Sequence, residues 1–391
     1  MLSKNKYIYI DLIMLSKFGK NDGGRETWAY NFLPALIHDK KIKLNIFGYR
    51  LNTDEDNSNL LKQLDISNNI NPIIITGKKN KFPKFISMLL KLKYFLKKFD
   101  KPKPNYTIAM GIFELIMILF NKRFSNSIRV VWLRSIFLNE KSYRIPNFLI
   151  KLAEKFEYIL LKKVDIILAN GDDIKAHYEQ FGLNITVIKN GVDSLKWDMQ
   201  PPIIKEVIKV AYIGRLSQVK GIESFMDLIK QIKNSSYSKK FEFHIVGDAN
   251  NYISDVKEFE NNDWITYHNS IENSKLPIFL KDIDVCVALT FASASGGGGG
   301  TSNALLEQMA ASKIIIAWDN VIFKQLLNDE NSYLVEQYSV EKLNTALLDI
   351  YYNNNVAINR AIQAQITSLE FTVESQIEKF EKLIANYYKG K

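Results

Sequence analysis

Two cationic side chains follow a strongly apolar run in the second half of the sequence. Arg215 and Lys220 lie in "YIGRLSQVKGIESF" (212–225), directly after the run "IKVAYIG" (208–214). In an open parallel sheet, ligands bind beyond the carboxyl ends of the strands. An arginine fork and a mobile lysine ammonium placed there neutralise a diphosphate. The spacing alone leaves a diphosphate site and a pair of solvated surface cations equally open.

A glycine tract leads into a second candidate site in "ASASGGGGGTSNALLEQMAASK" (292–313). We expect a helix to begin near Ser302, so that glycine backbone and the unpaired N–H groups of the helix approach a phosphate. Glu307 lies about one and a half turns into this helix, where a carboxylate accepts hydrogen bonds from ribose hydroxyls. A flexible linker is the alternative, but the tract separates a buried strand from an apolar helix rather than two domains.

The first apolar run of the chain is followed by a third candidate loop, "FGKNDGGRETWAYNFLPAL" (18–36). Gly23 and Gly24 precede an amphipathic helix there. This pattern suits a loop that approaches a ligand closely, but it is not the dinucleotide fingerprint G-x-G-x-x-G. An ordinary loop is equally compatible with it.

A basic amphipathic helix is predicted within residues 78–103, which contain ten lysines and the single acidic residue Asp100. Lys84, Lys91 and Lys98 share one side of this helix. The other side carries Phe85, Met88, Leu89, Leu92, Phe95, Leu96 and Phe99. Such a helix commonly lies in a membrane interface. A core-packing helix with a solvated lysine face is the alternative.

The sequence shows no motif typical of metal binding or of nucleophilic catalysis. The four histidines lack ligand spacing, and H-E-x-x-H, C-x-x-C and G-x-S-x-G are absent. His244 and His268 lie in apolar runs and are interpreted as core residues. Cys286, the only cysteine, is interpreted as a small buried side chain in a chain kept in a reducing compartment.

Apolar runs alternate with helical periodicity along the whole chain. In the first half the runs are 7–12, 43–48, 71–76, 106–111, 128–133, 164–170 and 185–190. In the second half they are 208–214, 241–247, 264–269, 284–289 and 313–318. Runs that are apolar throughout are typical of parallel strands buried on both faces, so we predict a doubly wound α/β architecture.

Length and charge divide the chain in two. A chain of 391 residues exceeds the roughly 250–300 residues that one core supports. Residues 1–200 contain 33 Lys and Arg against 19 Asp and Glu, whereas the remainder contains 19 against 23. The prolines of "LKWDMQPPIIK" (195–205) indicate a linker. We therefore predict an N-terminal domain over 1–200, a C-terminal domain over 201–372 and a final helix, 373–391, that packs back on the N-terminal domain.

The motifs taken together resemble the glycosyl transferases group 1 family, whose members are retaining enzymes with the GT-B fold. The family's "GG-E", "I-NGVD", "GRL---KG", "IVG-G" and "EG---ALLEAMA-G-P-I-" correspond here to "GGRE", "IKNGVD", "GRLSQVKG", "IVGDAN" and "GGTSNALLEQMAASKIIIAW". The order is conserved between the two, and the resemblance covers mainly residues 164–335.

This resemblance implies two Rossmann-like domains facing across a cleft, with a nucleotide diphosphate sugar as co-substrate and no other cofactor or metal. Arg215 and Lys220 would contact the phosphates, and Glu307 would hold the ribose. The other implied donor-binding residues are Gly23, Gly24, Gly214, Gly299, Gly300, Thr301, Ser302, Asn303, His268, Ser270 and Ile271. Of these, the segment from His268 to Ile271 would lie near the base.

Two positions depart from the family pattern. Gly299 stands where the family usually has a glutamate that touches the donor sugar, eight residues before Glu307. Arg134 lies in the region where members commonly carry a histidine near the reacting centre. These departures bear on sugar recognition and catalysis more than on fold.

The sequence therefore predicts a retaining, metal-independent glycosyltransferase that extends a glycan or lipid-linked glycan of bacterial lipopolysaccharide, O-antigen or capsule. It would be cytoplasmic and peripheral at the inner face of the plasma membrane, because no signal peptide or membrane-spanning run is present. Arg134, Lys84, Lys91 and Lys98 would lie on the acceptor or membrane side, facing anionic lipid or acceptor.

Three alternatives belong to other classes. A non-catalytic sugar-nucleotide-binding subunit that supports a partner enzyme is compatible with Gly299 and the missing histidine. Nucleic-acid binding is disfavoured, because the lysines lack the aromatic and glycine patterns of RNA modules. A sugar-nucleotide epimerase would share the architecture but not "GRL---KG".

Overall fold

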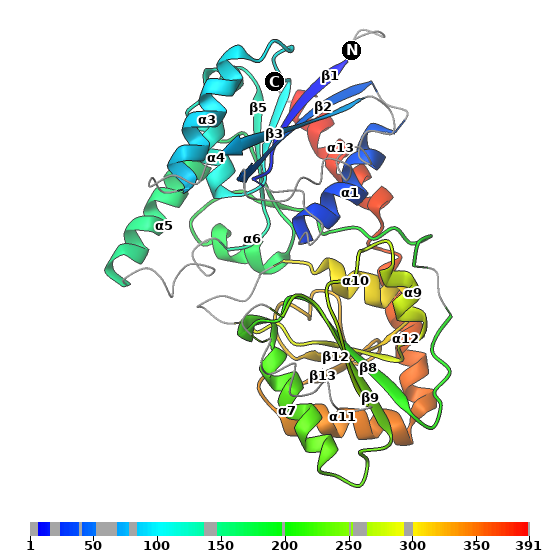
Figure 1. Ribbon diagram of the computed structural model, residues 1–391. Helices are drawn as coiled ribbons and strands as arrows, with labels where there is room; N and C mark the ends of the chain where they lie inside the picture. Colours follow the sequence, from blue (N-terminus) through cyan, green and yellow to red (C-terminus); the bar gives the residue numbers. More distant parts are fainter. Residues whose placement is uncertain are drawn as a thin grey trace. The chain divides into compact units, whose positions relative to one another are not determined.

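A computed structural model describes residues 7–15, 24–38, 41–51, 69–77, 84–136, 147–197, 200–249, 252, 264–292 and 300–389. The chain divides into two compact units. The first comprises Met1–Lys189 and Ile377–Lys391, and the second comprises Asn190–Gln376. Each unit contains a parallel sheet with helices packed around it (Figure 1). This division follows from contacts within each unit. The domain limits near residues 200 and 372 remain a prediction from the sequence.

Within its described residues, the first unit has a seven-stranded sheet in the order β3-β2-β1-β4-β5-β6-β7. The strands are β1 (Ile8–Ile13), β2 (Ile42–Leu51), β3 (Ile70–Gly77), β4 (Tyr106–Ala109), β5 (Ile128–Leu133), β6 (Ile166–Ala169) and β7 (Thr186–Val187). The helices are α1 (Gly24–Ile37), α3 (Lys84–Lys98), α4 (Ile112–Leu119), α5 (Asn147–Leu161), α6 (Asp172–Glu179) and most of α13 (Val373–Lys389).

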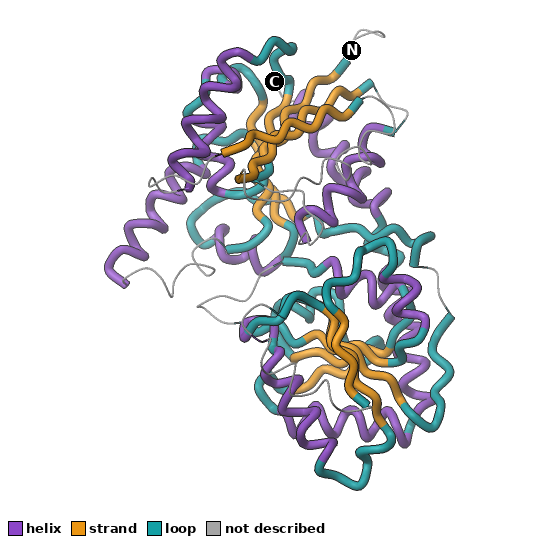
Figure 2. Tube along the Cα trace, in the orientation of Figure 1, coloured by secondary structure: helices purple, strands orange, loops and turns teal. Residues whose placement is uncertain are grey.

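The described residues of the second unit form a six-stranded sheet in the order β10-β9-β8-β11-β12-β13. The strands are β8 (Ile208–Ile213), β9 (Phe241–Val246), β10 (Ile265–His268), β11 (Val285–Ala288), β12 (Ile314–Trp318) and β13 (Tyr333–Val335). The helices are α7 (Ile222–Lys233), α9 (Leu276–Lys281), α10 (Asn303–Ala310), α11 (Val340–Tyr352) and α12 (Asn354–Ser368). Figure 2 shows helices on both faces of this sheet.

Both sheets are doubly wound, as predicted, and all their strand pairs are parallel. The strand order reverses beside the first strand of each unit. β1 pairs with β2 on one side and β4 on the other, and β8 pairs with β9 and β11 in the same way. Loops that leave such neighbouring strands diverge at their carboxyl ends and open a crevice, which is where open α/β sheets bind ligands.

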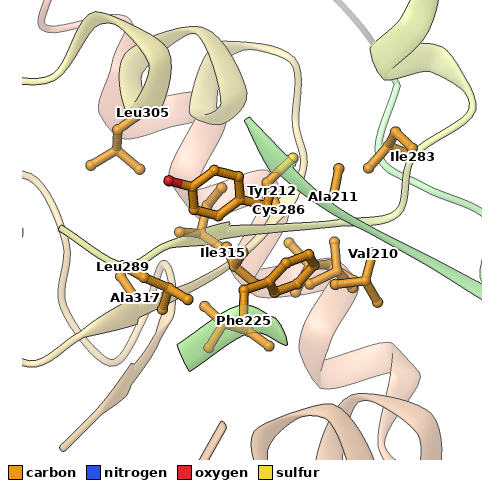
Figure 3. Packing of buried hydrophobic residues seen from close by; sticks show 14 of the residues in the cluster. Val210, Ala211, Tyr212, Phe225, Ile283, Cys286, Leu289, Leu305, Ile315 and Ala317 are labelled. Carbon is orange, nitrogen blue, oxygen red and sulfur yellow. The ribbon is translucent and has the colours of Figure 1, made fainter. Parts of the chain in front are cut away.

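The core of the second unit lies between its sheet and the flanking helices (Figure 3). The apolar side of α7 is buried, and Phe225 of this helix stacks on Tyr212 with ring centroids 5.7 Å apart. Cys286 is fully buried among these side chains. Burial raises the pKa of its thiol to about 12, so Cys286 is a packing residue without thiolate reactivity at neutral pH.

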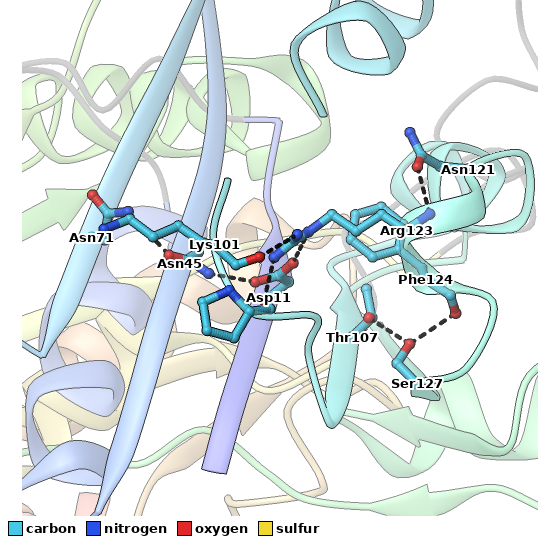
Figure 4. Close-up of polar contacts among 10 residues, drawn as sticks. Asp11, Asn45, Asn71, Lys101, Thr107, Asn121, Arg123, Phe124 and Ser127 are labelled. Carbon is cyan, nitrogen blue, oxygen red and sulfur yellow. Dashed lines mark hydrogen bonds and ion pairs between the residues drawn. The ribbon is translucent and has the colours of Figure 1, made fainter. Parts of the chain in front are cut away.

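A buried ion pair anchors the first sheet near its amino edge (Figure 4). The Asp11 carboxylate accepts hydrogen bonds from Arg123 Nε at 2.8 Å and from Asn45 Nδ2 at 2.6 Å. Asn71 Nδ2 in turn donates to Asn45 Oδ1 at 3.0 Å, which links β1, β2 and β3. A buried carboxylate without partners would be strongly destabilising, so this network explains how β1 accommodates an acid.

The last helix, α13, belongs to the first unit from Ile377 onward. Phe380 is buried and stacks on Trp132 of β5, with ring centroids 5.6 Å apart. It also meets the edge of Phe32 from α1 at 5.6 Å. The apolar stripe of the C-terminal helix therefore covers the aromatic side chains between α1 and the first sheet.

Close backbone packing at the crevice of the second sheet requires glycine at position 221. Gly221 has φ +75°, and a Cβ added there would lie 2.3 Å from the carbonyl oxygen of Leu289. Gly182, in the first unit, also has φ +75°, but a Cβ there meets nothing within 4 Å. Comparing substitutions at the two glycines therefore distinguishes the free-energy cost of the left-handed conformation from the cost of the steric contact with Leu289.

We expect Gly182→Ala to lower the free energy of unfolding by about 1–2 kcal/mol, the cost of a left-handed alanine. Gly221→Ala should cost about 1–3 kcal/mol more, because the new methyl group overpacks against Leu289. Equilibrium urea unfolding followed by tryptophan fluorescence measures both values. Equal losses for the two variants would show that the loops after β8 and β11 separate freely.

Candidate functional site

The loop after β8 is held against the loop after β11. Lys220 Nζ donates a hydrogen bond to Thr290 Oγ1 at 3.3 Å, and the Phe291 amide donates to the Val219 carbonyl at 3.0 Å. The buried Tyr212 hydroxyl donates to the carbonyl oxygens of Arg215 and Lys220, at 2.9 and 3.2 Å. The crevice of the second sheet thus has a defined wall that carries the Lys220 ammonium, while the Arg215 side chain is exposed beside it.

The N-terminus of α10 forms another part of this edge. Ser302 is the N-cap, and its hydroxyl accepts a hydrogen bond from the Leu305 amide at 3.3 Å. The helix therefore starts where the sequence predicted. Gly300 and Thr301 are buried, and Asn190 Nδ2 donates to the Thr301 carbonyl at 2.6 Å. The asparagine of "IKNGVD" thus holds the loop that leads to the N-terminus of α10, where the helix dipole is positive.

Glu307 is buried within α10 at 5% exposure. Its Oε1 accepts a hydrogen bond from Asn273 Nδ2 at 2.9 Å, and Asn273 Oδ1 accepts one from Lys196 Nζ. Burial raises the pKa of Glu307 to about 7, and the Asn273 hydrogen bond and the Lys196 charge oppose this rise. Near neutral pH the carboxyl group is therefore poised between its neutral and charged forms.

The end of β10 lies beside β9. His268 Nε2 and His244 Nδ1 are 3.0 Å apart, and His244 Nε2 lies 3.1 Å from a Glu242 carboxylate oxygen. Burial lowers the pKa of His244 to about 4, so the pair is neutral at pH 7. The interpretation of both as core histidines is confirmed for His244, whereas His268 is half-buried at the strand end. Beyond it, Ser270 is exposed and Ile271 is half-buried.

The predicted glycines are placed unevenly. Gly214 directly follows β8, and Gly24 is exposed at the first position of α1. Gly23 and Gly299 lie outside the described residues. Asn303 begins α10, directly after the Ser302 cap.

The predicted acceptor-side residues all belong to the first unit, but in two places. Arg134 directly follows β5, with its guanidinium 5.2 Å from the ring centroid of Trp28. On α3, Lys91 donates to the Thr76 carbonyl at 3.0 Å, and the Lys98 ammonium lies 4.6 Å from the Tyr94 ring centroid. Lys84 opens α3, and its side chain lies outside the described part.

Sequence reasoning did not single out Asn190, Lys196 and Asn273, which hold the loop before α10 and the Glu307 carboxylate. Their only signal was proximity to recognised motifs, because partners 34 to 111 residues apart leave no local pattern. Among the described residues, no three His, Cys, Asp or Glu side chains are grouped as a metal site would need.

Comparison with known proteins agrees with this geometry. Residues 208–353, which carry the crevice and α10, match the family model described as glycosyl transferases group 1. The matched residues all lie within the second unit, which is therefore similar to a glycosyl transferases group 1 domain over this range. The match begins with β8 and ends after α11, so it includes Arg215, Lys220 and Glu307.

Solved structures extend the likeness to the whole chain. A sucrose-phosphate synthase from Thermosynechococcus elongatus matches 98% of this chain and 100% of its own, with a TM-score of 0.78 and 15% identity. Anabaena Alr3699/HepE in complex with UDP-glucose matches 97% and 100%, with a TM-score of 0.74 and 15% identity. At such low identity these matches establish the fold, and the chain has the GT-B fold that its sequence predicted.

A curated relative adds context from sequence. The "Uncharacterized 41.2 kDa protein in cps region" of Klebsiella pneumoniae is 25% identical over 219 residues, or 51% of this chain. The alignment spans 56% of that relative, about half of its length.

The raised pKa of Glu307 predicts a pH dependence of donor binding. If the ionised carboxylate accepts the ribose hydroxyls, affinity for a nucleoside diphosphate sugar should be about tenfold higher at pH 8 than at pH 6, because deprotonation through pH 7 precedes binding. Titration calorimetry at both pH values measures this.

Two controls isolate the ribose contact. The Glu307→Gln variant should bind the donor weakly, with an affinity that does not depend on pH. A 2′,3′-dideoxy donor should bind the unaltered protein with an affinity that is likewise independent of pH. Because burying an ionised Glu307 opposes folding above pH 5, Glu307→Gln should remain at least as stable as the parent at pH 8. A dideoxy donor with the full pH dependence would contradict the assignment.

Proposed function

We propose that this protein is a glycosyltransferase that transfers a sugar, with retention and without a metal ion, from a nucleoside diphosphate sugar to a glycan or lipid-linked glycan. The acceptor class follows from the cps-region relative and from the basic first half of the chain. Surface polysaccharide synthesis at the inner face of the plasma membrane is the setting that fits both.

One observation carries the proposal: the second sheet presents positive charge, a helix N-terminus and a buried carboxylate at the carboxyl ends of its strands. Lys220 lies at Thr290 on the crevice wall, Ser302 caps α10, and Glu307 lies about one turn inside that helix. A diphosphate and a ribose are the two parts of a ligand whose chemistry matches these groups, which supports a nucleoside diphosphate sugar as the donor. A dinucleotide site would instead need a glycine fingerprint, which the chain lacks.

The chemical demand of the reaction matches these groups. Breaking the anomeric C–O bond transfers negative charge to the departing nucleoside diphosphate, and preorganised positive groups stabilise that charge in the transition state. Arg215 and Lys220 supply full charges, and the N–H groups at the start of α10 supply a partial one. The charge that a metal ion provides in other enzymes is thus available from the chain itself.

A second surface, on the first unit, suits contact with anionic lipid. α3 exposes Leu90 and Tyr94 at 60% and 62%, and α5 exposes Leu152 and Phe156 at 63% and 51%. Both helices also carry exposed lysines, Lys93 and Lys97 on α3 and Lys151 and Lys155 on α5. Helix α4 contacts both helices (Figure 1). A groove of about 700 Å³ lies beside α3, lined in part by Leu90, Tyr94 and Lys98. No helix in the described ranges is long and apolar enough to span a membrane.

Donor binding is tested by a thermal-shift panel of nucleoside diphosphate sugars. We expect donors of one nucleoside to raise the Tm, with about 2.7 kcal/mol of stabilisation at a donor concentration near 100 times Kd. Lys220→Ala and Glu307→Ala should lose most of this shift. Lys230→Ala removes an exposed lysine in the last turn of α7 and should keep it.

Turnover separates the enzyme from a non-catalytic subunit. Hydrolysis or transfer of the stabilising donor, with the anomeric configuration followed by NMR, should show retention. Binding without turnover on any acceptor would favour a sugar-nucleotide-binding subunit, and no shift with any donor would overturn both.

Membrane contact is tested by sedimentation with vesicles. Vesicles containing phosphatidylglycerol should bind the protein at low salt, and binding should fall as salt screens the lysines. Replacing Leu90 and Tyr94 by serine should weaken binding to these vesicles, because the apolar side chains that would enter the lipid interface are lost. Ile278→Ser, on the exposed face of α9, is the matched control and should bind normally. Equal binding to neutral vesicles would contradict an electrostatic contribution.

A further inference from the structure

The crevice of the first sheet contains an arginine cluster that the proposed donor chemistry leaves unused. Glu114, near the start of α4, accepts hydrogen bonds from the Leu15 amide and from an Arg25 guanidinium nitrogen, both at 3.1 Å. Leu15 follows β1, and Glu114 follows β4, so the group lies where the strand order of the sheet reverses. This is the position at which an open α/β sheet binds its ligand.

A second guanidinium lies beside this pair. Arg134 follows β5, the neighbour of β4, and its guanidinium carbon lies 5.2 and 6.0 Å from the ring centroids of Trp28 and Trp132. The positive charge of Arg25 acts on it electrostatically. Glu114, which is buried, pairs with Arg25 and not with Arg134.

Unpaired hydrogen-bonding atoms identify what is missing from this cluster. One terminal nitrogen of Arg134 and the indole nitrogens of Trp28 and Trp132 are buried and have no hydrogen-bond partner among the residues that the structure describes. All three are donors. Buried donors are normally satisfied, because an unpaired buried donor opposes folding. Three neighbouring donors, one of them charged, therefore call for an acceptor group that carries negative charge.

We propose that Arg134, supported by Arg25 and Trp28, forms an oxyanion-binding site in the first unit, and that the acceptor sugar or lipid carries a phosphate, pyrophosphate or carboxylate that binds there. The assignment to the acceptor rests on the proposed glycosyltransferase function. A bidentate guanidinium matches the geometry of each of these oxyanions. The site selects acidic acceptors, because a neutral sugar would leave the buried nitrogen of the Arg134 guanidinium without an anionic partner.

Fluorine NMR of the full chain labelled with 5-fluorotryptophan tests this proposal without donor or turnover. The five tryptophans report on both units, since Trp28 and Trp132 belong to the first and the other three to the second. Each resonance is assigned with a Trp→Phe variant. The protein is then titrated with inorganic phosphate, inorganic pyrophosphate, glucuronate and, as the neutral match of glucuronate, glucose.

The resonances of Trp28 and Trp132 should shift with at least one oxyanion and not with glucose. A response to the phosphates indicates a phosphorylated or lipid-pyrophosphate acceptor, and a response to glucuronate indicates an acidic sugar. Arg134→Gln should raise the apparent Kd by about tenfold or more. Arg129→Gln, at the opposite end of the same strand, is the matched control and should keep the response.

Arg25→Gln supplies a second variant in case Arg134→Gln folds poorly. Dispersed resonances of Trp28 and Trp132 before any ligand is added verify that the first unit folds in each variant. No response of Trp28 or Trp132 to any oxyanion overturns the proposal. An equal response to glucose, or a full response in Arg134→Gln, overturns it too. A failed donor panel would leave this titration unaffected, so the two hypotheses fail separately.

Discussion

The candidate donor site depends on how closely the backbone after β8 packs against the backbone after β11. Parallel strands place all their carboxyl ends on one edge, and the reversal of strand order between β8 and β11 opens a crevice there. Gly221 brings the two loops together at the Leu289 carbonyl, and the hydrogen bond between Lys220 and Thr290 follows from that contact. A side chain at position 221 would displace the ammonium group from the wall that it occupies.

Glu307 shows that the site is maintained at a cost in stability. Its pKa is raised because desolvation outweighs the hydrogen bond from Asn273 and the charge of Lys196. A folded-state pKa above the ordinary value means that ionising this carboxyl group opposes folding as pH rises toward 7. A buried carboxylate can accept strong hydrogen bonds from the hydroxyl groups of a ligand, because few other donors compete for its oxygen atoms.

Buried charge has two different roles in the first sheet. Near the amino edge of the first sheet, Asp11 and Arg123 are paired and further satisfied by Asn45, so that network is structural. At the carboxyl edge of the same sheet, Arg134 has a buried nitrogen with no hydrogen-bond partner in the described part of the chain, and the Glu114 carboxylate accepts a hydrogen bond from Arg25. The contrast between a satisfied buried network and an unsatisfied one distinguishes a structural role from a ligand-binding role.

The sequence alone determined the elements and their order. Continuous apolar runs required strands buried on both faces, and each predicted run contains a strand; β13, with three residues, was too short for a periodic signal. The glycine tract and the capping residue Ser302 predicted the start of α10, because helix capping is a local interaction. Only the tertiary structure could decide which side chains meet. Asn273 reaches Glu307 across 34 residues, and Arg25 reaches Glu114 across 89. Contacts of that span, and the desolvation that moves the pKa of Glu307, arise from the packing of whole layers and leave no trace in residue spacing.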